Sequence, residues 1–566
     1  MRMLNGAWNL IARAAHLAGA RKPEADGLLR VLRDDPAWPR AIRQADGARI
    51  LIATGMACYN HARVVERTLA AALTLRGART DMLLCDRVLP ACQMTKIQNS
   101  EVDALLARPD TPRCQGCMED AVRLFDPLGL RVLRYGAFLS AENVAQARKL
   151  AREVPLAAIP TFRPGGLAVG EHAYAGALRY FARGDLEGEP RGEDVLRRFL
   201  LSALLTAAAM QALLSKHRYD VAVFHHGIYT PQGIVGEVCR AAGVRVVNWN
   251  PSYRRNTFVF SEGDTYHHTM IEEPVETWDD IGWNEQIERR TLEYLDSRRV
   301  GSSDWIWFHE SPEADTDALG RELGVDWTRP CVGLLTSVMW DAQLHYRTNA
   351  FPDMLAWLRH TVEYFARRPD LQLLVRVHPA EIRGMVPSRQ RVVEELGRMF
   401  PHLPRNVFVI GPEHPASTYA CMERCDAVLI FNTKTGIELA CLGLPVIVAG
   451  EAWIRGKGFS IDASTPAAYD AILDALPLGR RMDPGQVERA RRYAFHFFFR
   501  RMLELPFISS PKKYAFEVEL AALDDLRPGR HPGLDVICRG ILEATPFVDR
   551  YEDRMGAGAT QKADSA

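Results

Sequence analysis

The chain has 566 residues, a length that predicts two or more domains with ample core. Its composition, 47% hydrophobic and 25% charged, is ordinary for a soluble globular protein. Its 70 basic and 70 acidic residues cancel, so the net charge recruits neither nucleic acid nor an acidic surface. Any anion must therefore be recognised by a local group of residues.

The N-terminal segment has no signal-peptide core, because Arg13 and His16 interrupt its apolar residues. Residues 1–45 predict a basic, amphipathic helical arm that packs on its own protein or rests on a membrane surface. The apolar run 199–214 is shorter than the roughly 20 residues that span a bilayer, and we expect a buried helix there. We expect the chain in the cytoplasm, with reduced cysteines.

A strand at 49–53, a helix to residue 76 and a strand at 82–85 open a Rossmann-like domain, expected over residues 46–305. This domain contains a cysteine-rich insert with Cys85, Cys92, Cys114 and Cys117, four of the eleven cysteines of the chain. Four thiolates predict a structural zinc site without an open coordination position. The alternatives are four unligated thiols, or a redox pair at Cys114 and Cys117.

Histidines end the next predicted strand, at 219–224. His225 and His226 lie at its carboxyl end, where α/β enzymes place side chains that meet substrate. Such a histidine acts as a general base or donates to an anion, or it merely satisfies a loop carbonyl. The following segment, 250–270, is rich in polar and aromatic residues and suits a hydroxylated substrate; it includes Asp264 and His268.

A second Rossmann-like domain is expected over residues 306–480. Three of its predicted strands end in polar residues, at 337–341, 378–381 and 432–436. Parallel strands place these ends on one rim, which predicts a shared anion pocket. Lys434, Arg455 and Lys457 add positive charge near the last turn. The same turn also matches the pattern of a capping box, Thr435-x-x-Glu438, an alternative interpretation that requires no ligand.

Residues 481–552 predict closing helices, and residues 553–566 a disordered tail. The predicted fold class is therefore α/β, with two Rossmann-like domains facing a cleft in a GT-B-like arrangement and extra helices at both termini.

Several motifs resemble those of capsule polysaccharide biosynthesis proteins. They are HHGIYTPQG (225–233), WDAQLHY (340–346), RVHPAE (376–381) and TKTGIELACLGLPVIVAGEAWIRGKGF (433–459). The resemblance covers roughly residues 220–505. Members of that family are regarded as GT-B glycosyltransferases of surface-glycan assembly. The resemblance implies a nucleotide-sugar donor as co-substrate, a glycan or lipid-linked glycan as acceptor, and a place at the inner face of the cell membrane.

The resemblance also implies roles for individual residues. The donor site would comprise His378, Pro379, Glu381, Thr433, Lys434, Thr435, Gly436, Glu438, Arg455 and Lys457. His378-Pro379 would hold the donor phosphate, and Glu438 would reach the ribose. An inverting transfer would need a base on the acceptor side, with candidates in the order His226, His225, Asp264, His268. A nucleotide-sugar epimerase of the same architecture and a non-catalytic assembly component are the competing interpretations.

Overall fold

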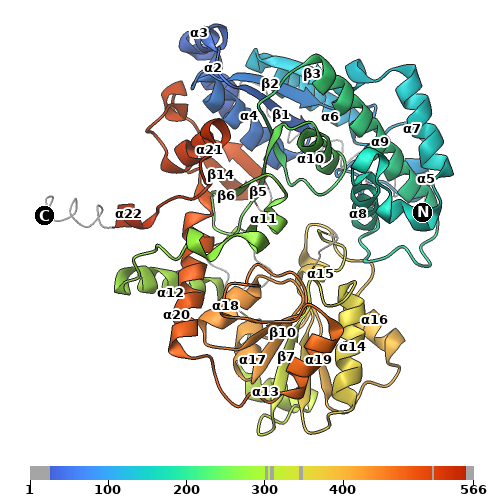
Figure 1. Cartoon of the computed structure of the whole chain (residues 1–566), viewed down its shortest axis with the longest axis vertical. Coiled ribbons are helices and arrows are strands. Elements are labelled where there is room, and N and C mark those ends of the chain that lie inside the picture. The colour runs from blue at the N-terminus through green and yellow to red at the C-terminus, as the bar shows by residue number, and fades with distance from the viewer. Residues whose placement is uncertain (1–25, 300–303, 306–311, 343–347, 513–514, 556–566) are drawn as a thin grey trace, which may run out of the picture.

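The computed structural model describes residues 26–299, 304–305, 312–342, 348–512 and 515–555. Two sheets, one mainly and one wholly parallel and each covered by helices, form two domains that face each other across a cleft (Figure 1). The predicted α/β class with two Rossmann-like domains is confirmed. Most of the predicted N-terminal arm and nearly all of the predicted tail lie outside the described residues.

The N-terminal sheet has the strand order β13-β6-β5-β4-β1-β2-β3. Its five parallel strands are β1 (Arg49–Gly55), β2 (Arg79–Leu84), β3 (Arg131–Arg134), β4 (Val221–His225) and β5 (Arg245–Pro251). The strands β6 (Thr257–Glu262) and β13 (Leu503–Glu504) extend the sheet in antiparallel pairing. Because side chains alternate along a strand, β1 contributes to two cores on opposite faces.

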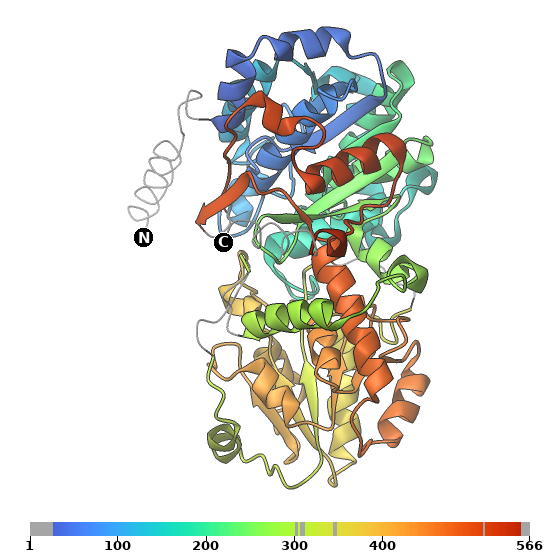
Figure 2. The ribbon, with the colours of Figure 1, turned by 90° about the vertical axis from the view of Figure 1, so that its left-hand side faces the viewer.

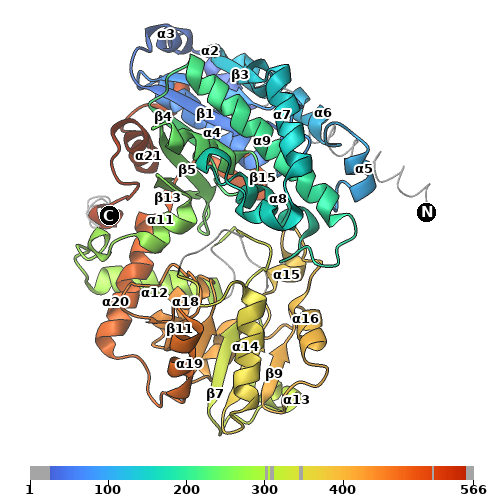
Figure 3. The same ribbon diagram turned by 45° about the vertical axis from the view of Figure 1, so that its right-hand side comes forward.

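One face of this sheet is covered by α4 (Asn60–Thr74) and α21 (Pro532–Glu543), which pack on Ile50 and Ile52. The other is covered by α8 (Val169–Phe181), α9 (Gly192–Lys216) and α10 (Gln232–Ala241), which pack on Leu51 and Ala53 (Figure 3). In the described part of the chain, α9 is the one helix long and apolar enough to cross a membrane. Of its most apolar window, 61% is buried inside the protein. With 25 residues, α9 is longer than the buried helix that was predicted from the apolar run 199–214.

The C-terminal sheet is parallel throughout, in the order β12-β11-β10-β7-β8-β9. Its strands are β7 (Cys331–Leu335), β8 (Gln372–Arg376), β9 (Val407–Ile410), β10 (Ala427–Ile430), β11 (Val446–Val448) and β12 (Ile461–Asp462). They are short and buried, and α14 (Met354–Ala366), α18 (Thr435–Cys441) and α19 (Pro466–Asp474) pack against them. The strand order reverses at β7, with β10 and β8 on either side. The carboxyl ends of these three strands are where a doubly wound sheet binds its ligands.

Two segments join the domains. The helix α12 (Glu285–Arg299) lies along the C-terminal domain and contacts α20 (Pro484–Phe495), as Figure 2 shows. From α20 the chain returns to the N-terminal domain, where β13 joins the sheet and α21 packs on one of its faces. The domains are also tied directly, since the Lys457 ammonium donates to the carbonyl oxygens of Ile271, at 3.0 Å, and Glu273. The segment after residue 481 therefore contributes to both domains.

One carboxyl group is buried in the N-terminal core. Glu66 of α4 is fully buried and accepts a hydrogen bond from the Trp249 indole at 2.9 Å. Burial raises the pKa of Glu66 to about 7, although the hydrogen bond from Trp249 opposes this shift. In an unfolded chain the pKa of a glutamate is roughly 4.3. Ionisation therefore favours the unfolded state, and stability is lost as pH rises between these two values.

We expect Glu66→Gln to stabilise the protein at pH 8 by up to about 3–4 kcal/mol, because the amide still accepts from Trp249 and does not ionise. At pH 4.5 the gain should nearly vanish. Urea unfolding of both proteins, followed by tryptophan fluorescence at the two pH values, measures this. An equal difference at both pH values would contradict the buried ionisation.

Candidate functional site

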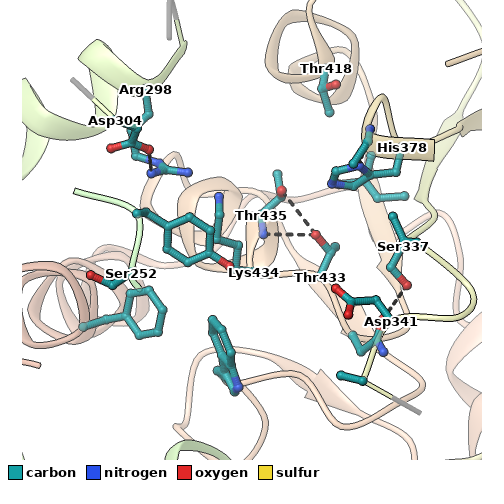
Figure 4. Close-up of a pocket in the computed structure, with 18 of the residues that line it drawn as sticks. Ser252, Arg298, Asp304, Ser337, Asp341, His378, Thr418, Thr433, Lys434 and Thr435 are labelled. Atoms are coloured by element: carbon teal, nitrogen blue, oxygen red, sulfur yellow. Dashed lines mark hydrogen bonds and ion pairs between the residues drawn. The ribbon is translucent and has the colours of Figure 1, made fainter. Parts of the chain in front are cut away.

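A cavity of about 450 Å³ lies between the two domains, a volume typical of small-molecule sites. The N-terminal domain contributes residues that follow β5 and lie on α11 (Tyr266–Glu272), including Ser252, Tyr253, Tyr266 and His267. The C-terminal domain contributes the ends of β7, β8 and β10, with Ser337, Asp341, His378, Thr433, Lys434 and Thr435 (Figure 4). The three strand ends singled out in the sequence thus meet at one cavity.

Hydrogen bonds fix the rim of the C-terminal domain. The Ser337 hydroxyl, after β7, donates to the Asn432 side-chain oxygen, after β10, at 2.5 Å. The Thr433 hydroxyl donates to the Thr435 hydroxyl at 3.3 Å and accepts from the Thr435 backbone N–H at 3.4 Å. Figure 4 shows the side chains of Ser337, Thr433 and Thr435 on this rim. The rim therefore presents hydroxyl groups that can donate to an anion without carrying charge.

His378 lies across this rim, on the turn after β8. Its backbone N–H donates to the Thr336 hydroxyl at 3.0 Å, and its Nδ1 accepts from the Ala380 backbone N–H at 3.0 Å. A neutral imidazole whose Nδ1 accepts carries its proton on Nε2. The Pro379 ring also lines the cavity. The His378 ring is thus oriented by its own turn, with Nε2 as a donor.

A buried ion network supports the wall behind Lys434. The Glu438 carboxylate pairs with Lys434 at 2.8 Å and Arg298 at 3.1 Å, and it accepts from the Tyr419 hydroxyl; Arg298 also pairs with Asp304. Burial raises the pKa of Glu438, but the charges of Arg298 and Lys434 outweigh it and lower that pKa to about 2. Two cations therefore offset two carboxylates.

This network changes two expectations from the sequence. Helix α18 begins at Thr435, and its N-cap, Lys434, makes no side-chain cap. The pattern Thr435-x-x-Glu438 is therefore no capping box. Glu438 does not line the cavity, because its oxygens are used by Arg298, Lys434 and Tyr419. Arg298 was not predicted as a partner of Glu438, because it lies 140 residues away in another helix.

Four more residues expected to bind the donor lie outside the cavity. Arg455 donates to the carbonyl oxygens of Gly450, at 3.0 Å, and Thr348, at 3.1 Å. Lys457 donates to the carbonyl oxygens of Ile271 and Glu273, as described above. Glu381 accepts from the Val392 backbone N–H at 2.9 Å, and burial raises its pKa to about 7. The Cα of Gly436 faces Ile430 and Ile454, so this glycine serves close packing.

The four residues predicted as candidates for the base also lie outside the lining of the cavity. His225 packs against Trp249 and Tyr59, and burial lowers its pKa well below the ordinary range. His226, at a φ of 67°, packs against Tyr229 and Tyr266, and burial likewise lowers its pKa. Asp264 and His268 pair with each other at 2.9 Å. These side chains shape the wall behind the cavity.

Two residues that were not candidate bases do line the cavity. His267 lies beside Trp453, with ring centroids 5.5 Å apart, and burial lowers its pKa to about 3. Asp341 accepts from the Tyr229 hydroxyl at 2.9 Å, and burial raises its pKa. Asp341 stands at a strand end noted in the sequence. His267 was not predicted as a base. Which of the adjacent residues His267 and His268 faces the cavity depends on the residue at which α11 begins.

The cysteines lie apart from this cavity. Cys85, Cys92, Cys114 and Cys117 line a second pocket together with Cys58, which the sequence did not single out. Burial raises the pKa of Cys92 to about 12. Within the described residues, no three His, Cys, Asp or Glu side chains are arranged around a single metal ion.

Comparison with known proteins gives one family match. Residues 328–471 match the family model described as capsule polysaccharide biosynthesis protein. No curated protein matches the chain. These residues run from just before β7 into α19, so they include all three strand ends of the cavity.

Among solved structures, two domains of Thermosulfurimonas dismutans KpsC are similar. The β-Kdo 2,4-transferase shares 15% identity over 48% of this chain and 79% of its own, with a TM-score of 0.32. The β-Kdo 2,7-transferase shares 12% identity over 56% and 88%, also at 0.32. The spinosyn rhamnosyltransferase SpnG shares 11% identity over 79% and 95%, at 0.24. TM-scores this low carry no argument about activity. The family match thus covers about a quarter of the chain, the part that carries the C-terminal half of the cavity, and it agrees with the motifs quoted from residues 376–381 and 433–459.

Proposed function

We propose that this protein is a glycosyltransferase that moves a sugar from a nucleotide-sugar to a glycan during capsule assembly. The observation that carries the proposal is the interdomain cavity at the carboxyl ends of β7, β8 and β10. A site between two Rossmann-like domains lets one domain bind the donor while the other presents the acceptor. The family match supports a role in capsule synthesis.

We assign the donor phosphates to the C-terminal rim. The cations Arg298 and Lys434 are balanced by Glu438 and Asp304, so phosphate recognition falls largely to neutral donors. His378 Nε2 and the hydroxyls of Thr433 and Thr435 supply them. Donors fixed before the reaction stabilise the charge that develops on a leaving phosphate without further reorganisation. Glycosyl transfer from a nucleotide-sugar requires this stabilisation.

We assign the acceptor to the N-terminal wall and the base to Asp341. Its carboxylate is held by Tyr229, a residue of the opposite domain, and so lies where the two walls meet. Burial raises the pKa of Asp341, which makes its carboxylate a stronger base towards an acceptor hydroxyl. His267 and Trp453 provide an aromatic surface beside it, which suits a sugar ring.

The acceptor would be a growing glycan or a lipid-linked glycan. We place the reaction in the cytoplasm at the inner face of the cell membrane, where such acceptors are made. Donor identity is the first quantity to measure. A panel of nucleotides and nucleotide-sugars, assayed by thermal shift, is the appropriate start.

We expect His378→Ala to weaken binding of the stabilising nucleotide at least tenfold, about 1.4 kcal/mol, because a phosphate donor is lost. Titration calorimetry with that nucleotide measures the change. His402→Ala, an exposed histidine of the same domain, is the matched control and should bind as the wild type. Unchanged affinity in His378→Ala would remove the histidine from the donor site.

We expect Asp341→Asn to reduce transfer to an acceptor by about 10² to 10⁴-fold, the usual contribution of a general base, while nucleotide affinity stays near the wild-type value. In the wild type, turnover should fall as pH drops through the raised pKa of Asp341, because a protonated carboxyl accepts no proton. Transfer is followed by release of the nucleotide and by analysis of the extended glycan.

The exposed Asp370→Asn is the control and should retain full turnover. Normal transfer by Asp341→Asn would show that another group is the base. Conversion of the nucleotide-sugar without any acceptor would indicate an epimerase instead.

A further inference from the structure

The second pocket of the N-terminal domain is lined by five cysteines from three separate segments. Cys58 follows β1, Cys85 and Cys92 follow β2, and Cys114 and Cys117 lie on α6 (Cys114–Asp120). None of the five forms a disulfide. These five thiols come from positions up to 59 residues apart and meet in one pocket. Cysteine can serve as a small apolar side chain in a core, but that role does not require five of them in one place.

Two of these sulfurs have hydrogen-bonding neighbours in the surrounding loops. The Thr111 backbone N–H donates to the Cys114 sulfur at 3.4 Å, and the Thr111 hydroxyl lies 3.3 Å from the same sulfur. The Thr95 hydroxyl lies 4.0 Å from the Cys92 sulfur. Thiolates bound to metals are held by such N–H···S hydrogen bonds, which orient the sulfur and spread its charge. Cys58 differs in its position, since it follows β1 and lies outside the insert that carries the other four cysteines.

The arrangement favours a cluster over a single ion. No three of these side chains in the described structure close on one ion, although all five line one pocket. An iron–sulfur cluster contains several irons, so its four thiolate ligands stand farther apart than those of one zinc ion. The pocket is also lined by Arg113, whose charge suits the net negative charge of a thiolate-ligated cluster, whereas Arg87 in the same lining pairs with Asp110 at 2.7 Å.

We propose that Cys85, Cys92, Cys114 and Cys117 bind an iron–sulfur cluster, with Cys58 as a neighbouring thiol that is not a ligand. The cluster would hold the insert together beside the turn after β1, because all four ligands come from the insert and Cys58 of that turn lines the same pocket. Metal binding by such a segment adds directly to its stability.

The insert also supports the wall of the interdomain cavity. The Gln93 backbone N–H, beside Cys92, donates to the Thr230 carbonyl at 2.9 Å. Arg179 donates to the Gln93 carbonyl at 2.5 Å. The neighbouring Tyr229 holds Asp341, as described above. A cluster in this pocket would therefore help to position the Asp341 carboxylate from the opposite domain.

The test is the metal content of the full-length protein purified without oxygen. We expect iron and inorganic sulfide in equal amounts, about two to four irons per chain, with the broad visible absorption of an iron–sulfur cluster. Cys117→Ser should lower bound iron several-fold and remove the absorption. Cys58→Ser, the same change in the same pocket, should retain both. Cys239→Ser, a buried cysteine on α10, controls for general loss of packing.

These measurements do not depend on the proposed transferase activity, so the two proposals fail separately. One zinc per chain without iron would overturn the cluster in favour of the single-ion site that the sequence suggested. Protein without iron or zinc, after anaerobic purification and after incubation with iron and sulfide, would also overturn it. Loss of iron in Cys58→Ser to the same extent as in Cys117→Ser would refute the ligand assignment.

Discussion

The buried carboxylate of Glu438 is the interaction on which the C-terminal wall of the cavity depends. It joins Lys434, at the start of α18, to Arg298, at the end of α12, in a setting from which water is nearly excluded. Removing one partner of such a pair leaves a buried charge without compensation, at a cost of about 3–5 kcal/mol. The network thus fixes a helix that carries rim residues against the segment that links the two domains.

This electrostatic balance explains the chemistry of the rim. The charges of Lys434 and Arg298 are already matched, so we assign a phosphate to the imidazole of His378 and the hydroxyls of Thr433 and Thr435. Neutral donors hold a phosphate group less strongly than unpaired cations would, which would suit the proposed release of a nucleotide after each transfer. On the other wall, Tyr229 orients Asp341 across the domain boundary, so the site is complete only when the domains face each other.

The repeated pattern of strand, turn and helix was sufficient to predict both Rossmann-like domains and the three strand ends that meet at the cavity. His378, Thr433 and Lys434 were found because they follow buried strands directly in the sequence. Pairing between residues far apart in the sequence was not predictable. Glu438 matched a helix-cap pattern, and its partner Arg298 is too remote in the sequence to be recognised. Arg455 was predicted to bind phosphate, because the backbone carbonyl groups that it contacts leave no signal in the sequence. The choice of His267 over His268 depends on helix phase, which a single sequence fixes poorly.

The most direct test of the account is a structure of the protein with the nucleoside diphosphate that stabilises it. The account predicts phosphate oxygens within hydrogen-bond distance of His378 Nε2 and the Thr433 hydroxyl, with the open end of the ligand directed towards Asp341. A nucleotide bound outside the interdomain cavity, or one whose phosphates contact neither residue, would contradict it.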